Sequence, residues 1–153
     1  MEIWERERDR VLLGAVEGED HDGWMIGPVT VTCDGDAAAV LDRCRAVMAV
    51  MLPWPRETWP TPEAWETLLP AWFVEACAAP SASGELCTPW PLGAWTGVFA
   101  EDWRPWFWWD ARVLSDDVFE LEIAIDGFPF GEAAMRWLLV AAGARSAEGT
   151  LEF

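Results

Sequence analysis

The residues best suited to chemistry lie in one alternating stretch, where tryptophans stand beside carboxylates. Strand alternation over 106–113 and 119–125, joined by a short acidic loop, places two tryptophans and three carboxylates on one side of a hairpin. An indole face attracts cations, and carboxylates pair with them. We expect this side, together with the acidic loop, to bind a protein surface rich in Arg or Lys. The residues predicted to bind the partner are Trp106, Trp108, Asp110, Asp116, Asp117, Glu120 and Glu122.

Two of these carboxylates also admit an enzymatic interpretation. The hairpin register that pairs Arg112 with Glu120 sets Asp110 opposite Glu122, and like charges placed so repel each other. A cation from a partner would relieve the repulsion. A glycosidase would instead use such a pair with one carboxyl kept protonated near neutral pH by burial.

A third interpretation is that a helix or loop covers this side of the hairpin, so that its tryptophans belong to the core.

A second candidate site comes from tryptophans in the proline-rich connections. Ten of the thirteen tryptophans lie between Trp54 and Trp109, more than the packing of one small region usually needs. Trp65 and Trp72 fall on an apolar helical stripe and Trp109 on the inner strand face, so we assign these three to the core. The connection tryptophans either pack against proline rings or line a pocket for a small molecule or carbohydrate. The predicted pocket residues are Trp54, Trp59, Trp90, Trp95 and Trp103.

The remaining inventory of side chains favours a binding protein over an enzyme, although Asp, Glu or Cys could still support catalysis. The chain has no lysine or tyrosine, one histidine and no glycine-rich nucleotide loop. His21 lies in an acidic segment without the ordered ligand spacing of a calcium loop, so we interpret it as part of a solvated turn. No cofactor and no metal site are predicted. Irregular spacing indicates four reduced thiols, at Cys33, Cys44, Cys77 and Cys87.

Net charge limits the class of partner. The chain carries 27 acidic against 10 basic residues, for a formal charge of -17. Direct binding to nucleic acid or to an anionic membrane is disfavoured, because both depend on Lys and Arg contacts. The charge favours a basic protein partner, or serves solubility alone.

The sequence also bears on location and origin. Its amino terminus lacks the apolar core of a signal peptide, and no apolar run reaches the roughly 20 residues of a membrane-spanning helix. We therefore expect a cytoplasmic protein without a membrane segment. The joint absence of Lys, Asn, Gln and Tyr is typical of a GC-rich bacterial gene.

The strands expected to position these residues form two hairpins. Alternating apolar residues predict strands over 10–16 and 24–33, joined by a polar loop, ahead of the later hairpin over 106–113 and 119–125. Pro28 lacks a ladder donor, which places its end of the strand at an edge or a bulge. A last short strand could follow over 150–153.

Helices occupy the intervals between the strands. A capping Asp34 or Asp36 starts a core helix, and Thr61 caps a second helical segment in which Pro70 marks either a kink or a boundary between two helices. The segment 79–91 is read as a loop. The predicted helices cover 37–51, 61–76, a short turn within 92–99, and 131–142.

This order of elements predicts an α+β fold. Helices grouped between hairpins indicate a two-layer sandwich, with an antiparallel sheet of about four strands built from two hairpins and three or four helices packed on it. At 153 residues, with 52% hydrophobic residues, the chain has the size and composition of a single globular domain over 1–153.

Charge and exposed tryptophans together favour one functional hypothesis. We expect an acidic protein-binding module that docks on a basic protein, as a toxin-neutralising immunity protein, an inhibitor or a nucleic-acid mimic does. The alternative is a tryptophan-lined binder of a small molecule or carbohydrate, with hydrolysis through Asp or Glu as a further option.

Overall fold

The computed structural model describes residues 5–81, 87–101 and 104–153 and has the predicted α+β class. Within these ranges, four strands form one antiparallel sheet in the order β2-β3-β1-β4, with six α-helices, more than the three or four predicted. The strands are β1 (Met25–Cys33), β2 (Trp106–Val113), β3 (Val118–Ile125) and β4 (Ala144–Gly149). The helices are α1 (Glu7–Leu13), α2 (Ala37–Met51), α3 (Pro62–Leu68), α4 (Ala71–Ala78), α5 (Leu92–Ala100) and α6 (Ala133–Ala142), with a 3-10 turn η1 (Arg56–Thr58).

The first predicted hairpin does not form. Residues 10–16, predicted as a strand, belong instead to α1 and the start of the irregular segment that follows it. Glu7, Arg10 and Val11 have the i, i+3, i+4 spacing of one helical face, and all three are buried. The predicted sheet of two hairpins is therefore wrong in this detail. β1 pairs with β3 and β4.

The carboxyl end of the chain supplies the strand that borders β1. β4 covers 144–149, earlier than the predicted strand over 150–153, and Phe153 exchanges two backbone hydrogen bonds of 3.2 Å with Ala147. Pro28 lies just beyond the last β1–β4 pair, and its carbonyl accepts from the Thr150 amide at 2.9 Å. The amide nitrogen and the carbonyl of a strand residue point to the same side. An amide hydrogen at position 28, which proline lacks, would therefore point toward the end of β4, where the β1–β4 ladder stops.

The longest helix, α2, follows its predicted boundaries. The Asp36 carboxylate accepts a hydrogen bond from the Ala39 amide at 3.0 Å and so caps the first turn. Its buried residues form one apolar stripe, Ala37, Val40, Leu41, Cys44, Val47, Met48 and Met51.

Pro70 divides the next helical segment into two. The residue before it, Leu69, adopts an extended conformation that ends α3, because the proline ring disfavours helical geometry there. Of the two predicted alternatives, two abutting helices are observed, and the short turn predicted within 92–99 is the helix α5.

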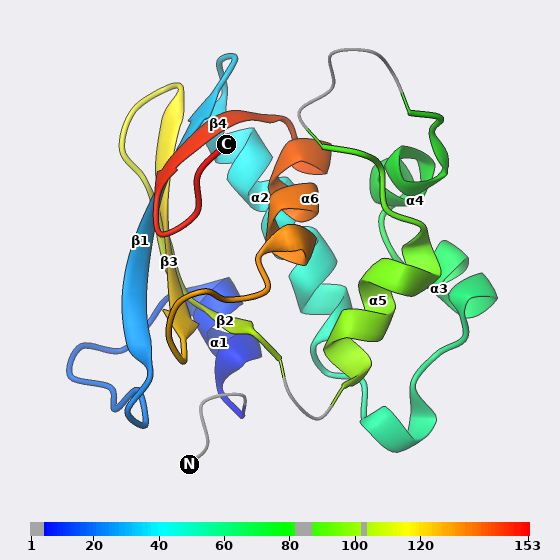
Figure 1. The fold of residues 1–153 in the computed structure, drawn as a ribbon, viewed down its shortest axis with the longest axis horizontal. Coiled ribbons are helices and arrows are strands. Elements are labelled where there is room, and N and C mark those ends of the chain that lie inside the picture. The colour runs from blue at the N-terminus through cyan, green and yellow to red at the C-terminus, as the bar shows by residue number, and fades with distance from the viewer. Residues whose placement is uncertain (1–4, 82–86, 102–103) are drawn as a thin grey trace.

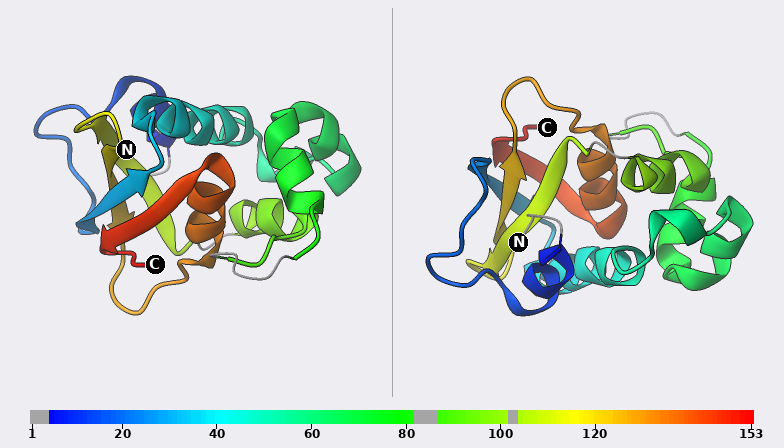
Figure 2. Two further views of the ribbon diagram at one scale, coloured as in Figure 1. Left: turned by 90° about the horizontal axis from the view of Figure 1, so that it is seen from above. Right: turned by 90° about the horizontal axis from the view of Figure 1, so that it is seen from below.

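The helices lie on one side of the sheet. Figure 1 shows α2 and α6 beside the sheet, with α3, α4 and α5 farther from it, and Figure 2 shows the same order from above and below. Buried strand residues such as Val29, Val31 and Leu121 join the same core as the helical stripes. The opposite side, called here the outer face of the sheet, carries none of the long helices (Figure 2).

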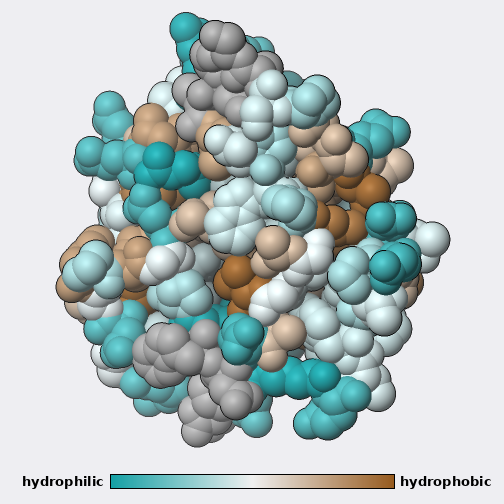
Figure 3. Space-filling view, turned by 45° about the vertical axis from the view of Figure 1, so that its right-hand side comes forward, coloured by the Kyte–Doolittle hydropathy of each residue, from teal (hydrophilic) through white to brown (hydrophobic). Residues whose placement is uncertain are grey.

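Charge is sparse on α4 and α5. α5 has no charged residue and α4 has only Glu75. Pale and brown surfaces accordingly cross the middle of this side, with the hydrophilic groups toward its margins (Figure 3). No helix in the described ranges is both long and apolar enough to cross a membrane.

Candidate functional site

A β-bulge at Trp109 decides which side of β2 meets the core. Trp108 pairs with Ile123 and Asp110 pairs with Glu122, so Trp109 is an extra residue without a partner on β3. The alternation of side chains therefore changes phase between positions 108 and 110. A strict two-residue period, on which the sequence prediction depended, does not hold across this strand.

Trp106 and Trp108 are core residues, and the prediction that they are exposed is wrong. Both lie opposite isoleucines of β3 and are 1% exposed. Phe107 and Trp109 take the outer face instead, where they form a small cluster with Ala124. The tryptophans expected to anchor a partner are thus unavailable to one.

The predicted carboxylates do share the outer face. The register sets Asp110 opposite Glu122, as predicted, and Arg112 opposite Glu120, with which it forms an ion pair. The second row continues through Thr30 to Glu148. We call the set Asp110, Glu120, Glu122 and Glu148 the carboxylate face.

Burial and like charges both act on Glu122 at the centre of this face. Burial raises the pKa of Glu122, and the neighbouring charges of Asp110 and Glu120 raise it further. Arg112 lowers it only in part, from 4.0 Å. The carboxylate face therefore holds more negative charge than its one arginine neutralises.

The acidic loop has a structural role as well. Asp116 and Asp117 are exposed, and their backbone carbonyls accept from the amides of Ala37 and Cys33 at 2.8 and 2.7 Å. These bonds hold the tip of the β2–β3 hairpin against the start of α2. Both side chains lie beyond the end of the sheet, outside the two rows of the carboxylate face.

The end of the outer face nearest α1 is closed by a buried ionic network. Arg104 donates to both carboxylate oxygens of Glu7, and Glu7 also accepts the backbone amide of Trp108 at 2.9 Å. Arg10 Nε donates to the Trp108 carbonyl at 3.2 Å, and its guanidinium lies 4.7 Å from the Trp109 ring centre. Charged side chains thus occupy the open edge of β2 at the bulge.

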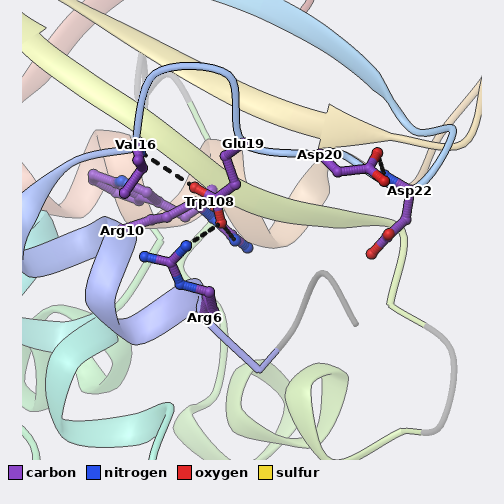
Figure 4. A network of polar contacts seen from close by, with 7 residues as sticks. All are labelled: Arg6, Arg10, Val16, Glu19, Asp20, Asp22 and Trp108. Atoms are coloured by element: carbon purple, nitrogen blue, oxygen red, sulfur yellow. Dashed lines mark hydrogen bonds and ion pairs between the residues drawn. The ribbon is translucent and has the colours of Figure 1, made fainter. Parts of the chain in front are cut away.

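A second ion pair fixes the connection between α1 and β1 over the same region. Glu19 accepts from Arg10 at 3.1 Å and lies 3.3 Å from Arg6, and it also accepts the Val16 amide (Figure 4). His21 in this connection stacks edge-on against Trp109, with ring centres 5.9 Å apart. The predicted solvated turn is therefore packed against the outer-face cluster on one side.

Glu7, Arg10 and Arg104 were not predicted from the sequence as functional residues. Glu7 and Arg104 lie 97 positions apart, and neither stands in a motif. Only the dense charge of the first ten residues hinted at a helix with ion pairs, and no sequence signal indicated that these charges are buried.

An aromatic pocket of about 330 Å³ lies where the end of α2, η1, α5 and β2 meet. Its base is the Glu7–Arg104 pair. Arg104 lies over the rings of Phe99 and Phe107, at 4.7 and 4.4 Å from their centres. The lining residues are Glu7, Trp24, Met51, Leu52, Trp54, Pro55, Arg56, Glu57, Trp59, Phe99, Arg104 and Phe107.

The five tryptophans predicted to form a pocket have different positions. Trp54 and Trp59 line the pocket, whereas Trp95 is fully buried and donates to the Ala134 carbonyl at 2.9 Å. Trp90 is partly buried against the core and lies outside the pocket lining. Trp103 falls outside the described residues.

Comparison of the chain with protein-family models, curated proteins and solved structures gives no match. Its function is therefore inferred from its own charges, exposed faces and pockets.

Metal-ligating and thiol chemistry find little support in the described residues. No group of three or more His, Cys, Asp or Glu side chains among them is arranged to hold a metal ion.

None of the four cysteines forms a disulfide. Burial raises the pKa of Cys44 to about 12, and it also raises the pKa of Cys33 and Cys77. These three are packing residues rather than nucleophiles.

Proposed function

We propose that the chain is an acidic protein-binding module whose carboxylate face docks on a basic protein. The observation that carries this proposal is a sheet surface on which Asp110, Glu120 and Glu122 lie half-buried and close together, with Arg112 as the ion-pair partner of the two glutamates. Burial, and then the charges of Asp110 and Glu120, raise the pKa of Glu122. An Arg or Lys from a partner would lower that repulsion on binding. Toxin-neutralising immunity proteins, inhibitors and nucleic-acid mimics are the kinds of protein that work this way.

The edges of the sheet support docking by the face over docking by strand addition. The β2 edge is occupied at Trp108 by Glu7 and Arg10, and the β4 edge is paired at Ala147 by Phe153. A partner strand would have to displace these groups. The outer face needs no such rearrangement.

Charge distribution supports the same surface. The net charge of -17 speeds the encounter with a basic partner. α5 has no charged residue and α4 has only Glu75, so these two helices offer no comparable cluster of carboxylates. Trp106 and Trp108 take no part, because both are buried. Affinity is therefore expected to depend on ion pairs and to fall with salt.

A tagged pull-down from the source organism tests the proposal. Three forms are compared at low and high salt: the parent chain, the face triple variant Asp110→Asn/Glu120→Gln/Glu122→Gln, and a control triple variant Glu63→Gln/Glu66→Gln/Glu75→Gln. The control removes the same charge from exposed positions of α3 and α4. Mass spectrometry identifies what each form retains.

We expect the parent and the control to retain one basic protein that the face variant loses. Equal retention by all three forms, or equal loss from both variants, would contradict docking through the carboxylate face.

A further inference from the structure

We propose that the aromatic pocket binds a small uncharged heteroaromatic molecule of one or two fused rings. The pocket shares Phe107 with the outer face, but none of the four residues of the carboxylate face lines it. Its volume of about 330 Å³ lies at the lower end of the range for small-molecule sites.

The pocket walls are held in place before any ligand arrives. Trp54 and Trp59 pack edge-on against the fully buried Trp65, with ring centres 6.0 and 5.2 Å away. Trp54 nevertheless keeps 36% of its surface exposed. Trp24 meets Phe107 edge-on at 5.0 Å on another wall. A flat ring can therefore insert against aromatic surfaces that need little reordering.

Charge at the pocket selects against ionic ligands. Glu7 and Arg104 neutralise each other at the base, and Arg56 and Glu57 contribute one charge of each sign. The Arg104 guanidinium already lies over Phe99 and Phe107, so the faces of those two rings are engaged with a cation. The four charged lining residues balance one another, so neither an anion nor a cation would find an excess of the opposite charge there. The pocket therefore favours uncharged compounds.

One polar feature favours a ring with a hydrogen-bond acceptor. Trp59 lines the pocket, and its indole N–H is buried with no acceptor among the described residues. A buried donor without a partner is unfavourable, so a ligand acceptor that meets this N–H after a small rotation of the Trp59 ring gains free energy. A ring nitrogen or a carbonyl oxygen fits this requirement.

Three related probes test the charge and ring requirements together. Quinoline is uncharged at neutral pH and carries a ring nitrogen, N-methylquinolinium is its cationic counterpart, and quinoline-2-carboxylate is its anionic one. Binding is followed by fluorine NMR of the full chain labelled with 5-fluorotryptophan, with resonances assigned from Trp54→Phe and Trp59→Phe. We expect quinoline to shift the Trp54 and Trp59 resonances saturably, and the charged probes to bind about tenfold more weakly or worse.

Two variants localise the site. Trp54→Ala should weaken quinoline binding by about tenfold, whereas Phe128→Ala, at an exposed aromatic outside the pocket, should leave it unchanged. Unshifted resonances of the other tryptophans verify that each variant is folded. The face triple variant should bind quinoline like the parent, which separates this proposal from the protein-binding one.

Several outcomes would overturn the proposal. They are the absence of saturable shifts up to about 5 mM quinoline, equal or tighter binding of either charged probe, and unchanged affinity in Trp54→Ala.

Discussion

Glu7 and Arg104, 97 positions apart in the chain, meet in a two-point ion pair that also receives the backbone amide of Trp108. Their side chains are 1% and 6% exposed. β2 is an edge strand, so the outward amide and carbonyl of Trp108 have no ladder partner and are satisfied by Glu7 and Arg10. The pair therefore attaches α1 to the sheet and protects the edge at the bulge.

Breaking this pair from one side should be costly. Glu7→Gln leaves the Arg104 charge buried without compensation, and we expect a loss of about 3–5 kcal/mol in the free energy of unfolding. Urea denaturation followed by circular dichroism measures it. The double variant Glu7→Met/Arg104→Met should recover much of the loss, and Asp34→Asn, in an exposed pair with Arg145, should change stability by less than about 1 kcal/mol. A Glu7→Gln protein as stable as the parent would contradict a buried ion pair.

Trp108 tests the position of the bulge. Because its ring is in the core, Trp108→Ala should destabilise the fold by about 3–5 kcal/mol, as other large core truncations do. Partner binding should decline only in proportion to the unfolded fraction. Trp108→Phe, which keeps an aromatic ring in the core, should retain full affinity for the partner. A folded Trp108→Phe protein with strongly reduced affinity for the partner would show that this residue belongs to the binding surface.

Glu122 should make stability depend on pH in a definite direction. Its pKa is raised in the folded state, so its favourable contribution is present below the ordinary carboxyl pKa and is lost as pH rises through the folded value. Glu122→Gln should therefore stabilise the chain at pH 7, by about 0.5 kcal/mol, and the gain should vanish in acid. Urea unfolding across this pH range measures the difference. Glu120→Gln, which loses the ion pair with Arg112, serves as the control and should show no gain.

The thiols should differ in reactivity. Cys33, Cys44 and Cys77 are buried with raised pKa values, whereas Cys87 is only half-buried. A disulfide reagent at mildly alkaline pH should modify one thiol in the native chain and all four in denaturant. Cys87→Ser should abolish the native reaction. Rapid native modification of Cys44 would show that the α2 stripe opens readily.

Local patterns predicted the elements whose signals are contained in a few adjacent residues. The capped stripe of α2, the alternation of β1 and the pairing of Arg112 with Glu120 all follow from spacing within one segment. The helix predicted over 131–142 is likewise observed as α6, which ends at the left-handed Gly143. The carboxylates of the candidate face were found in this way, whereas its supposed tryptophan anchors were not.

The sequence by itself determined the α+β class, the acidic character and most helix and strand positions, because side-chain periodicity and capping act within a few residues. Only the tertiary structure decided that Trp109 is the extra residue in β2, which turns Trp106 and Trp108 inward. It also decided the burial of Glu7 with Arg104 and the meeting of Trp54 with Phe107 around one pocket. Each of these depends on contacts between segments far apart in the chain, where no local pattern specifies the partner.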